Sequence, residues 1–159
     1  MRITERLVTL RTGILAGFLG GLIEVGWVSL YSDITGEDTR AFARGVTSAA
    51  GVRAILPGFN SALLDVGLNM TFVVVLSVVL TFTWRAFAKK HDLTNPFPFM
   101  LMILAGVWAT NFFVVLPILR PQLIHLVPYP VSLTSSLLVG VTIAAVVREE
   151  LPGRTLAAR

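Results

Sequence analysis

Four long apolar segments constrain this chain more than any other feature of its sequence. They run over residues 12–31, 59–84, 97–119 and 129–147, and together they carry only two charged residues, Glu24 and Asp65. A helix that crosses a bilayer needs roughly 20 mostly apolar residues, which is close to the length of each segment. The pattern predicts an all-α integral membrane protein, a four-helix bundle that forms a single transmembrane domain over residues 1–159.

The composition excludes several classes of protein. Of the 159 residues, 55% are hydrophobic and 14% are charged, whereas a soluble domain carries about 45–50% apolar and about 25% charged residues. This deviation excludes a disordered chain and argues against a soluble enzyme. The chain has no cysteine, so disulfides, thiolate metal sites and cysteine nucleophiles are excluded.

The sequence predicts no catalytic residue, no metal site and no cofactor. It contains no phosphate-binding loop, no Gly-x-Ser-x-Gly elbow and no His-Glu-x-x-His motif. Its two histidines, His91 and His125, fall in connections on opposite sides of the predicted bundle, so they cannot both hold one haem. We therefore expect a function that is not enzymatic.

Basic residues lie mainly on one side of the predicted bundle. Of the 13 lysines and arginines, nine fall in the N-terminus, the 85–95 connection and the C-terminus. The other four are Arg40, Arg44, Arg53 and Arg120. Because cytoplasmic connections are enriched in Lys and Arg, both termini are predicted to be cytoplasmic. The net charge of +4 then reflects orientation, and we expect no nucleic-acid partner.

A short amphipathic helix is predicted over residues 38–52, on the outer face of the membrane. At helical spacing Phe42, Val46 and Ala49 share one face, while Arg40 and Arg44 share another. Together with Arg53, these arginines are candidate contacts for lipid headgroups or an acidic partner. The alternative is that they form a solvated helix face.

Small residues recur at the spacing that lets membrane helices pack closely. The first span carries four glycines, and the fourth span repeats a small residue every four positions: Gly13, Gly17, Gly20, Gly21, Ser132, Ser136 and Gly140. These seams are predicted to join helices of one chain. The alternative is that a seam binds a partner subunit or a second copy.

Polar residues in the four spans gather at one depth. The predicted intramembrane cluster consists of Glu24, Asp65, Asn69, Asn111 and Ser135. Glu24 lies on the glycine face of its span, roughly 10 Å from the outer end at 1.5 Å per residue. A charge buried in a bilayer is costly, so the two acids require partners, water or a proton.

The cluster has three interpretations that the sequence leaves open. In the first, it is structural and holds the helices in one arrangement through hydrogen bonds. In the second, a carboxyl group exchanges a proton during transport. In the third, it binds another chain, a lipid or a quinone-like ligand.

Most of the chain resembles an uncharacterised family of small four-helix bacterial inner-membrane proteins. The resemblance rests on Val107-Trp-Ala-Thr-Asn-Phe-Phe-Val-Val-Leu-Pro and Pro121-Gln-Leu-Ile-His-Leu-Val-Pro-Tyr, with Gly21-Leu-Ile-Glu-Val-Gly-Trp-Val-Ser-Leu-Tyr and Ala43-Arg-Gly-Val-Thr. It implies location in the bacterial inner membrane, and it implies no activity or catalytic residue. The membrane glutamate in the first of four helices is also similar to that of small multidrug-resistance transporters, at the level of analogy.

These observations lead to two expected functions. The first is an accessory or scaffold subunit that packs against a larger, energy-transducing membrane assembly through other subunits or self-association. The alternative is a small proton-coupled transporter that works as a homo-oligomer around Glu24 and Asp65.

Overall fold

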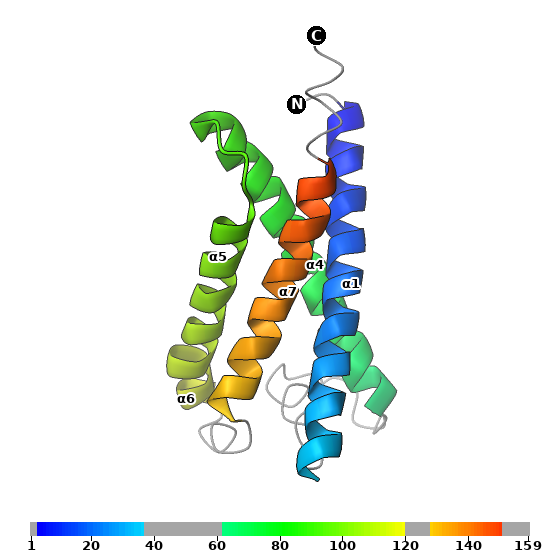
Figure 1. Cartoon of the computed structure of the whole chain (residues 1–159), viewed down its shortest axis with the longest axis vertical. Helices are drawn as coiled ribbons and strands as arrows, with labels where there is room; N and C mark the ends of the chain where they lie inside the picture. Colours follow the sequence, from blue (N-terminus) through cyan, green and yellow to red (C-terminus); the bar gives the residue numbers. More distant parts are fainter. Residues whose placement is uncertain (1–2, 37–61, 120–127, 151–159) are drawn as a thin grey trace.

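The computed structural model describes residues 3–36, 62–119 and 128–150, and these are almost entirely helical. The helices are α1 (Ile3–Thr35), α4 (Ala62–His91), α5 (Phe97–Thr110), the π-helical turn η1 (Asn111–Val115), α6 (Leu116–Leu119) and α7 (Tyr129–Glu150). Figure 1 shows them side by side along the long axis of the molecule. Four helical stretches are long and apolar enough to cross a membrane. The prediction of four apolar helices is therefore confirmed.

The helices extend beyond the predicted spans. Helix α1 begins at Ile3 rather than Thr12, and α4 continues to His91 rather than Trp84. Apolar length measures only the part that lies in hydrocarbon, whereas a helix continues through the headgroup region to a total of about 40–45 Å. Charged residues such as Arg6 and Lys89 therefore lie within the helices and not in loops.

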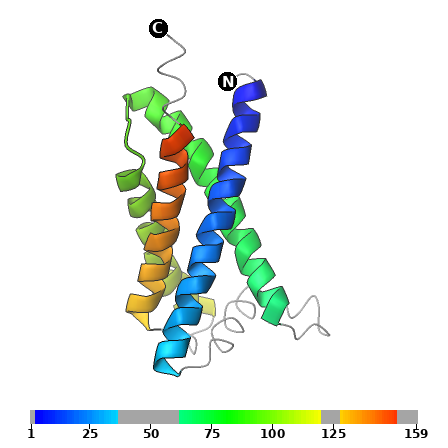
Figure 2. The same ribbon diagram turned by 45° about the vertical axis from the view of Figure 1, so that its right-hand side comes forward.

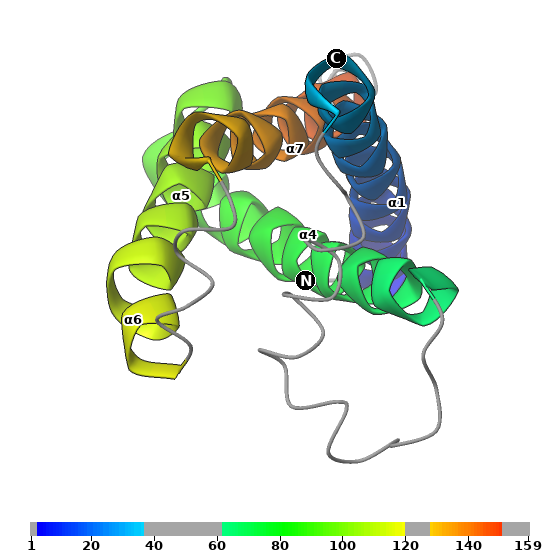
Figure 3. The same cartoon turned by 90° about the horizontal axis from the view of Figure 1, so that it is seen from below.

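The helices are arranged in space in the order α4, α1, α7, α5. Helix α1 packs along both α4 and α7, α5 packs along α7, and α4 meets α7 over a few residues only. One end of the bundle, which we call the terminal end, holds the first turn of α1 and the last turn of α7 (Figures 1 and 2). At the other end, which we call the distal end, α4 and α5 diverge, as Figure 3 shows from below.

Glycines bring α1 against α4 with the two backbones almost in contact. A Cβ atom placed on Gly17 would lie 2.6 Å from the Cα of Val74, and one on Gly13 would lie 2.7 Å from the Cα of Val78. Both distances are below any real contact, so only glycine allows this approach. Gly20 turns instead toward α7, where its Cβ would lie 3.3 Å from Val139 Cγ1.

An aromatic and aliphatic core closes the terminal half of the bundle. Trp84 of α4 is fully buried, with its ring centroid 5.4 Å from that of Phe99 on α5. Met100, Ile143 and Val147 are buried in the same cluster. This contact joins α4 to α5 near the short connection between them.

The third predicted span is not one regular helix. Its α-helical part ends at Thr110, and a π-helical turn over Asn111–Val115 precedes Pro117. Proline has no N–H to donate to the carbonyl of Phe113, and its ring displaces the preceding turn. The wider turn accommodates that loss.

Candidate functional site

Glu24 is the centre of a polar cluster that joins three helices. It lies on α1, and its Oε2 accepts a hydrogen bond from Asn69 Nδ2 of α4 at 3.2 Å. Its Oε1 accepts one from Ser135 Oγ of α7 at 3.3 Å. We call Glu24, Asn69 and Ser135 the distal cluster, since they lie in the distal half of the bundle. Within the described residues, Glu24 has no cationic partner.

The distal cluster contains three of the five residues that the sequence places at this depth. Asn111 is exposed, and no hydrogen bond joins it to the cluster within the described residues. The side chain of Asp65 lies outside the described part of the chain. The predicted surface helix over 38–52 lies outside it as well, with Arg40, Arg44 and Arg53.

Two tryptophans flank the distal cluster on either side of α7. Trp27 of α1 donates from Nε1 to the carbonyl of Val131 at 3.2 Å. Trp108 of α5 donates from Nε1 to Ser132 Oγ at 3.1 Å. Each indole therefore ties one neighbouring helix to the first turn of α7. Ser132, predicted only as a packing residue, is also a hydrogen-bond acceptor.

Aromatic rings surround Trp108 at the distal end of α5 and α7. Phe112 lies 5.2 Å from the ring of Trp108 and 5.2 Å from that of Tyr129. Phe113 stacks on Tyr129 at 6.2 Å, with an angle of 12° between the planes. Trp and Tyr are typical of the boundary between hydrocarbon and headgroups. These rings favour a membrane boundary near the start of α7.

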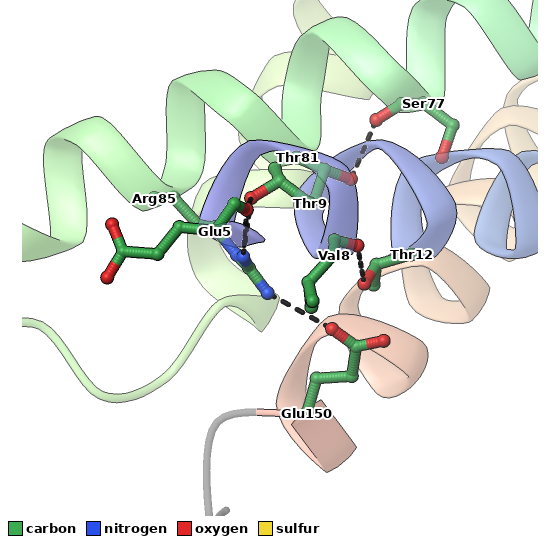
Figure 4. A network of polar contacts seen from close by, with 8 residues as sticks. All are labelled: Glu5, Val8, Thr9, Thr12, Ser77, Thr81, Arg85 and Glu150. Carbon is green, nitrogen blue, oxygen red and sulfur yellow. Dashed lines mark hydrogen bonds and ion pairs between the residues drawn. The ribbon is translucent and has the colours of Figure 1, made fainter. Parts of the chain in front are cut away.

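A second polar group, not predicted from the sequence, lies at the terminal end (Figure 4). Arg85 of α4 donates to the hydroxyl of Thr9 on α1, to the main-chain carbonyl of Glu5 at 3.4 Å, and to Glu150 Oε2 of α7 at 3.0 Å. The side chains of Arg85 and Glu150 are only 15% and 31% exposed. We call Arg85, Thr9 and Glu150 the terminal cluster, and it joins the same three helices as the distal cluster.

The sequence did contain a signal for the terminal cluster. Ser77, Thr81 and Arg85 follow each other at four-residue spacing, which is one face of a helix. Arg85 contributed only to the count of basic residues in a connection, so this periodicity was missed. Its partners lie 65 or more positions away in the chain, and no local pattern names them.

Buried hydroxyl groups lie between α1 and α4 next to the terminal cluster. Thr9, Thr12, Ser77 and Thr81 are fully buried. Each threonine donates to the carbonyl four residues earlier, at 2.6 to 2.8 Å. Such bonds satisfy a hydroxyl within its own helix. Ser77 Oγ and Trp84 Nε1 are the buried side-chain atoms of the described residues without a hydrogen-bond partner.

The small residues of the first and fourth spans lie at helix contacts within the chain. Gly13, Gly17 and Gly21 face α4, where Gly21 adjoins the thioether of Met70. Gly140 faces α5, and its Cβ would lie 3.5 Å from Leu101 Cδ2. Ser136 is half-buried on α7.

Chemically, the two clusters can hold helices together and can stabilise a carboxyl group at membrane depth. The described residues include no group of three or more His, Cys, Asp or Glu side chains that could hold a metal ion. Comparisons with protein-family models, with curated proteins and with solved structures found no match for this chain. The two polar clusters are therefore the candidate functional features of the described residues.

Proposed function

We propose that this chain is a non-enzymatic scaffold subunit that packs against a larger, energy-transducing membrane assembly. One observation carries the proposal: α1, α4 and α7 are tied together near both ends. Glu24 joins them in the distal half, and Arg85 joins them at the terminal end. Between the two clusters, glycines hold α1 almost against the backbone of α4.

This arrangement favours a fixed platform over a moving gate. A transporter that alternates between two states requires its helix pairs to rock or slide against each other. Sliding α1 by one turn would move it by about 5.4 Å and break the hydrogen bonds of both clusters. Because Gly13, Gly17 and Gly21 repeat every four residues, the glycine contacts alone would tolerate a slide by one turn, and it is the hydrogen bonds of the two polar clusters that fix the register. A rigid helix core is suited to a scaffold subunit that binds and positions other subunits.

We place the protein in a bacterial inner membrane with both termini in the cytoplasm. Five exposed basic residues of the described chain lie toward the terminal end of the bundle: Arg6, Arg11, Lys89, Lys90 and Arg148. This distribution supports the proposed orientation, since cytoplasmic flanks are enriched in Lys and Arg. Reporter fusions at each terminus test it. Activity of a periplasm-specific reporter at either terminus would overturn it.

The scaffold proposal is tested by extraction of the chain from native membranes into polymer-bounded bilayer discs. We expect discs that contain this chain together with the same additional membrane protein in repeated preparations. Cross-linking in intact cells before extraction should give the same pair. A chain that is recovered alone in both experiments would overturn the proposal.

The second candidate, a proton-coupled transporter, is favoured by one observation. Glu24 lies within a membrane span and is held by two neutral donors, with no cation among the described residues. Such a carboxyl group can gain and lose a proton. The transporter predicts that Glu24→Gln abolishes proton movement into dye-loaded proteoliposomes and leaves the folded yield unchanged. The scaffold predicts no proton movement in either form.

A further inference from the structure

Two arginines in the terminal half of the bundle point outward in opposite directions. Gly20 of α1 faces α7, where its Cβ atom would lie 3.3 Å from Val139 Cγ1. Arg11 lies nine residues before Gly20, and Arg148 lies nine residues after Val139. Nine residues make about two and a half turns of helix, which places each arginine on the side of its helix opposite that contact.

The two arginines also lie at one depth. Each is about 13.5 Å from the contact of α1 with α7 at 1.5 Å per residue, and both lie toward the terminal end. Two residues near the distal boundary, Trp27 and Tyr129, lie 16 residues from Arg11 and 19 residues from Arg148. These separations are about 24 and 28 Å, close to the ~30 Å thickness of the hydrocarbon core. Both arginines therefore lie at the opposite boundary, next to the headgroups.

Neither arginine has an anionic partner in the described part of the chain. Both side chains are exposed, and neither forms a hydrogen bond or an ion pair with the residues that the structure describes. Around Arg11, the side chains of Leu7, Ile14 and Leu15 are 45% to 60% exposed on the same face of α1. An arginine among lipid-facing side chains keeps its stem in the apolar layer and extends its guanidinium to the headgroups.

We propose that Arg11 and Arg148 each bind the phosphate of an anionic phospholipid, in the leaflet at the terminal end of the bundle. A guanidinium donates two parallel hydrogen bonds to a phosphate, so arginine is well suited to such a site. The negative charge of the headgroup strengthens binding by about fivefold for each basic residue near the membrane surface. Lipid fits this position better than a soluble phosphate, because its acyl chains pack on the exposed apolar side chains beside Arg11. The inference goes beyond the scaffold proposal and stands whether or not a larger assembly forms.

Lys90 provides a matched comparison for Arg11. It is exposed in the last turn of α4, 12 residues beyond Val78, which meets Gly13 of α1. It therefore lies about 18 Å along α4 from the level of Gly13, on the aqueous side of Arg11. Both residues count equally toward the orientation of the chain, but only Arg11 lies at the boundary of the hydrocarbon. Removing either charge therefore separates a lipid site from general electrostatic attraction.

The lipid composition next to a single fluorophore tests the proposal. The chain has no cysteine, so a label can be attached at Ile14→Cys, three residues from Arg11, or at Val79→Cys on α4. Val79 is 54% exposed, adjoins the level of Gly13, and has no basic residue within four positions. The vesicles contain phosphatidylcholine and phosphatidylglycerol, with only one of the two lipids brominated in each sample. At Ile14 we expect a preference for phosphatidylglycerol of about fivefold in quenching, and at Val79 none.

Substitutions then assign the preference to the arginines. Arg11→Gln should abolish it at Ile14, and Arg11→Lys, which keeps the charge, should retain part of it. Lys90→Gln should leave it unchanged. A label at Val141, seven residues from Arg148 on the same face of α7, should lose its preference in Arg148→Gln. Equal quenching by the two lipids at Ile14 would overturn the proposal, and so would equal losses in Arg11→Gln and Lys90→Gln.

Discussion

The replacement of Gly17 by alanine should destabilise the protein far more than the same change at Gly106. Both residues are helical glycines within spans. At Gly17 the new methyl group would lie 2.6 Å from Val74 Cα and 2.9 Å from Ser77 Cβ. Neither atom belongs to the flexible end of a side chain, so neither can rotate away. The two helices must separate by about 1 Å to restore ordinary contact distances.

The change in the free energy of unfolding for Gly17→Ala is the sum of two opposing effects. Overpacking of this kind costs about 1–3 kcal/mol, and a backbone obstacle places Gly17→Ala near the upper limit. Replacing a helical glycine by alanine returns about 1 kcal/mol of helix propensity. We therefore expect a net loss of about 2 kcal/mol at Gly17 and a gain of about 0.5–1 kcal/mol at Gly106, where a Cβ atom would find nothing within 4 Å.

Gly21→Ala provides a useful intermediate case. The nearest atom to its Cβ is the sulfur of Met70, which lies near the end of an adaptable side chain and can move aside. We expect a cost below about 1 kcal/mol at this position. The three variants should therefore rank Gly17, Gly21, Gly106 from the most to the least destabilised.

The assay is reversible unfolding in mixed micelles of mild detergent and dodecyl sulfate, followed by far-ultraviolet circular dichroism. The chain is diluted until it is monomeric, so that a contact between copies does not contribute. If Gly106→Ala lowers the free energy of unfolding as much as Gly17→Ala, the close contact of α1 with α4 is not what stabilises the bundle.

Three other predictions concern the polar contacts, each measured by the same unfolding assay. In a double-mutant cycle, Arg85→Gln and Glu150→Gln should show a coupling of about 1–2 kcal/mol, because both side chains are mostly buried, and a value near zero would contradict a role in stability. Glu24→Gln keeps a hydrogen-bonding group and should cost less than about 1 kcal/mol, whereas Glu24→Leu leaves Asn69 unsatisfied and should cost about 1–3 kcal/mol. Ser132→Ala should cost about 1 kcal/mol, and Trp108→Phe should cost more than that, because it removes ring packing on Phe112 as well as the hydrogen bond to Ser132. In the Trp108→Phe background Ser132→Ala should cost close to nothing, and additive losses would refute the hydrogen bond's role.

The sequence predicted the features of this fold that depend on local composition. Hydrophobic length located the four helices, because the cost of placing charges in hydrocarbon applies to each segment by itself. Position along a span indicated which polar residues could meet, and Asn69 and Ser135 do hydrogen-bond to Glu24. The side of the helix on which a residue lies was harder to predict from the sequence. Asn111 has the right depth, yet α5 packs on α7 and not on α1, so its side chain faces outward.

Other features depend on contacts between distant segments and could not be predicted. The sequence shows four glycines in α1 but does not say that Gly17 faces α4 while Gly20 faces α7. Arg85 follows an apolar span, so its charge indicated a connection at the membrane surface. Its actual partners come from the first turns of α1 and the last turn of α7. Hydrogen bonds between residues this far apart in the chain are determined by how the helices pack, so the sequence alone does not predict them.

The two polar clusters together define a single register for the three-helix core. Thr9 and Glu24 are 15 residues apart on α1, or about 22 Å along the axis, which is most of the hydrocarbon thickness. A shift of α1 that preserved one cluster would have to bend the helix to preserve the other, and the glycines between them resist such bending because the backbones are in contact.

Helix α5 takes part in neither cluster. It is held by apolar contacts, aromatic rings and the bond from Trp108 to Ser132. Within the part of the chain that the structure describes, Trp108 is the one α5 side chain that hydrogen-bonds to another helix, so the position of α5 depends mainly on apolar and aromatic packing, whereas α1 is fixed at both ends by polar contacts.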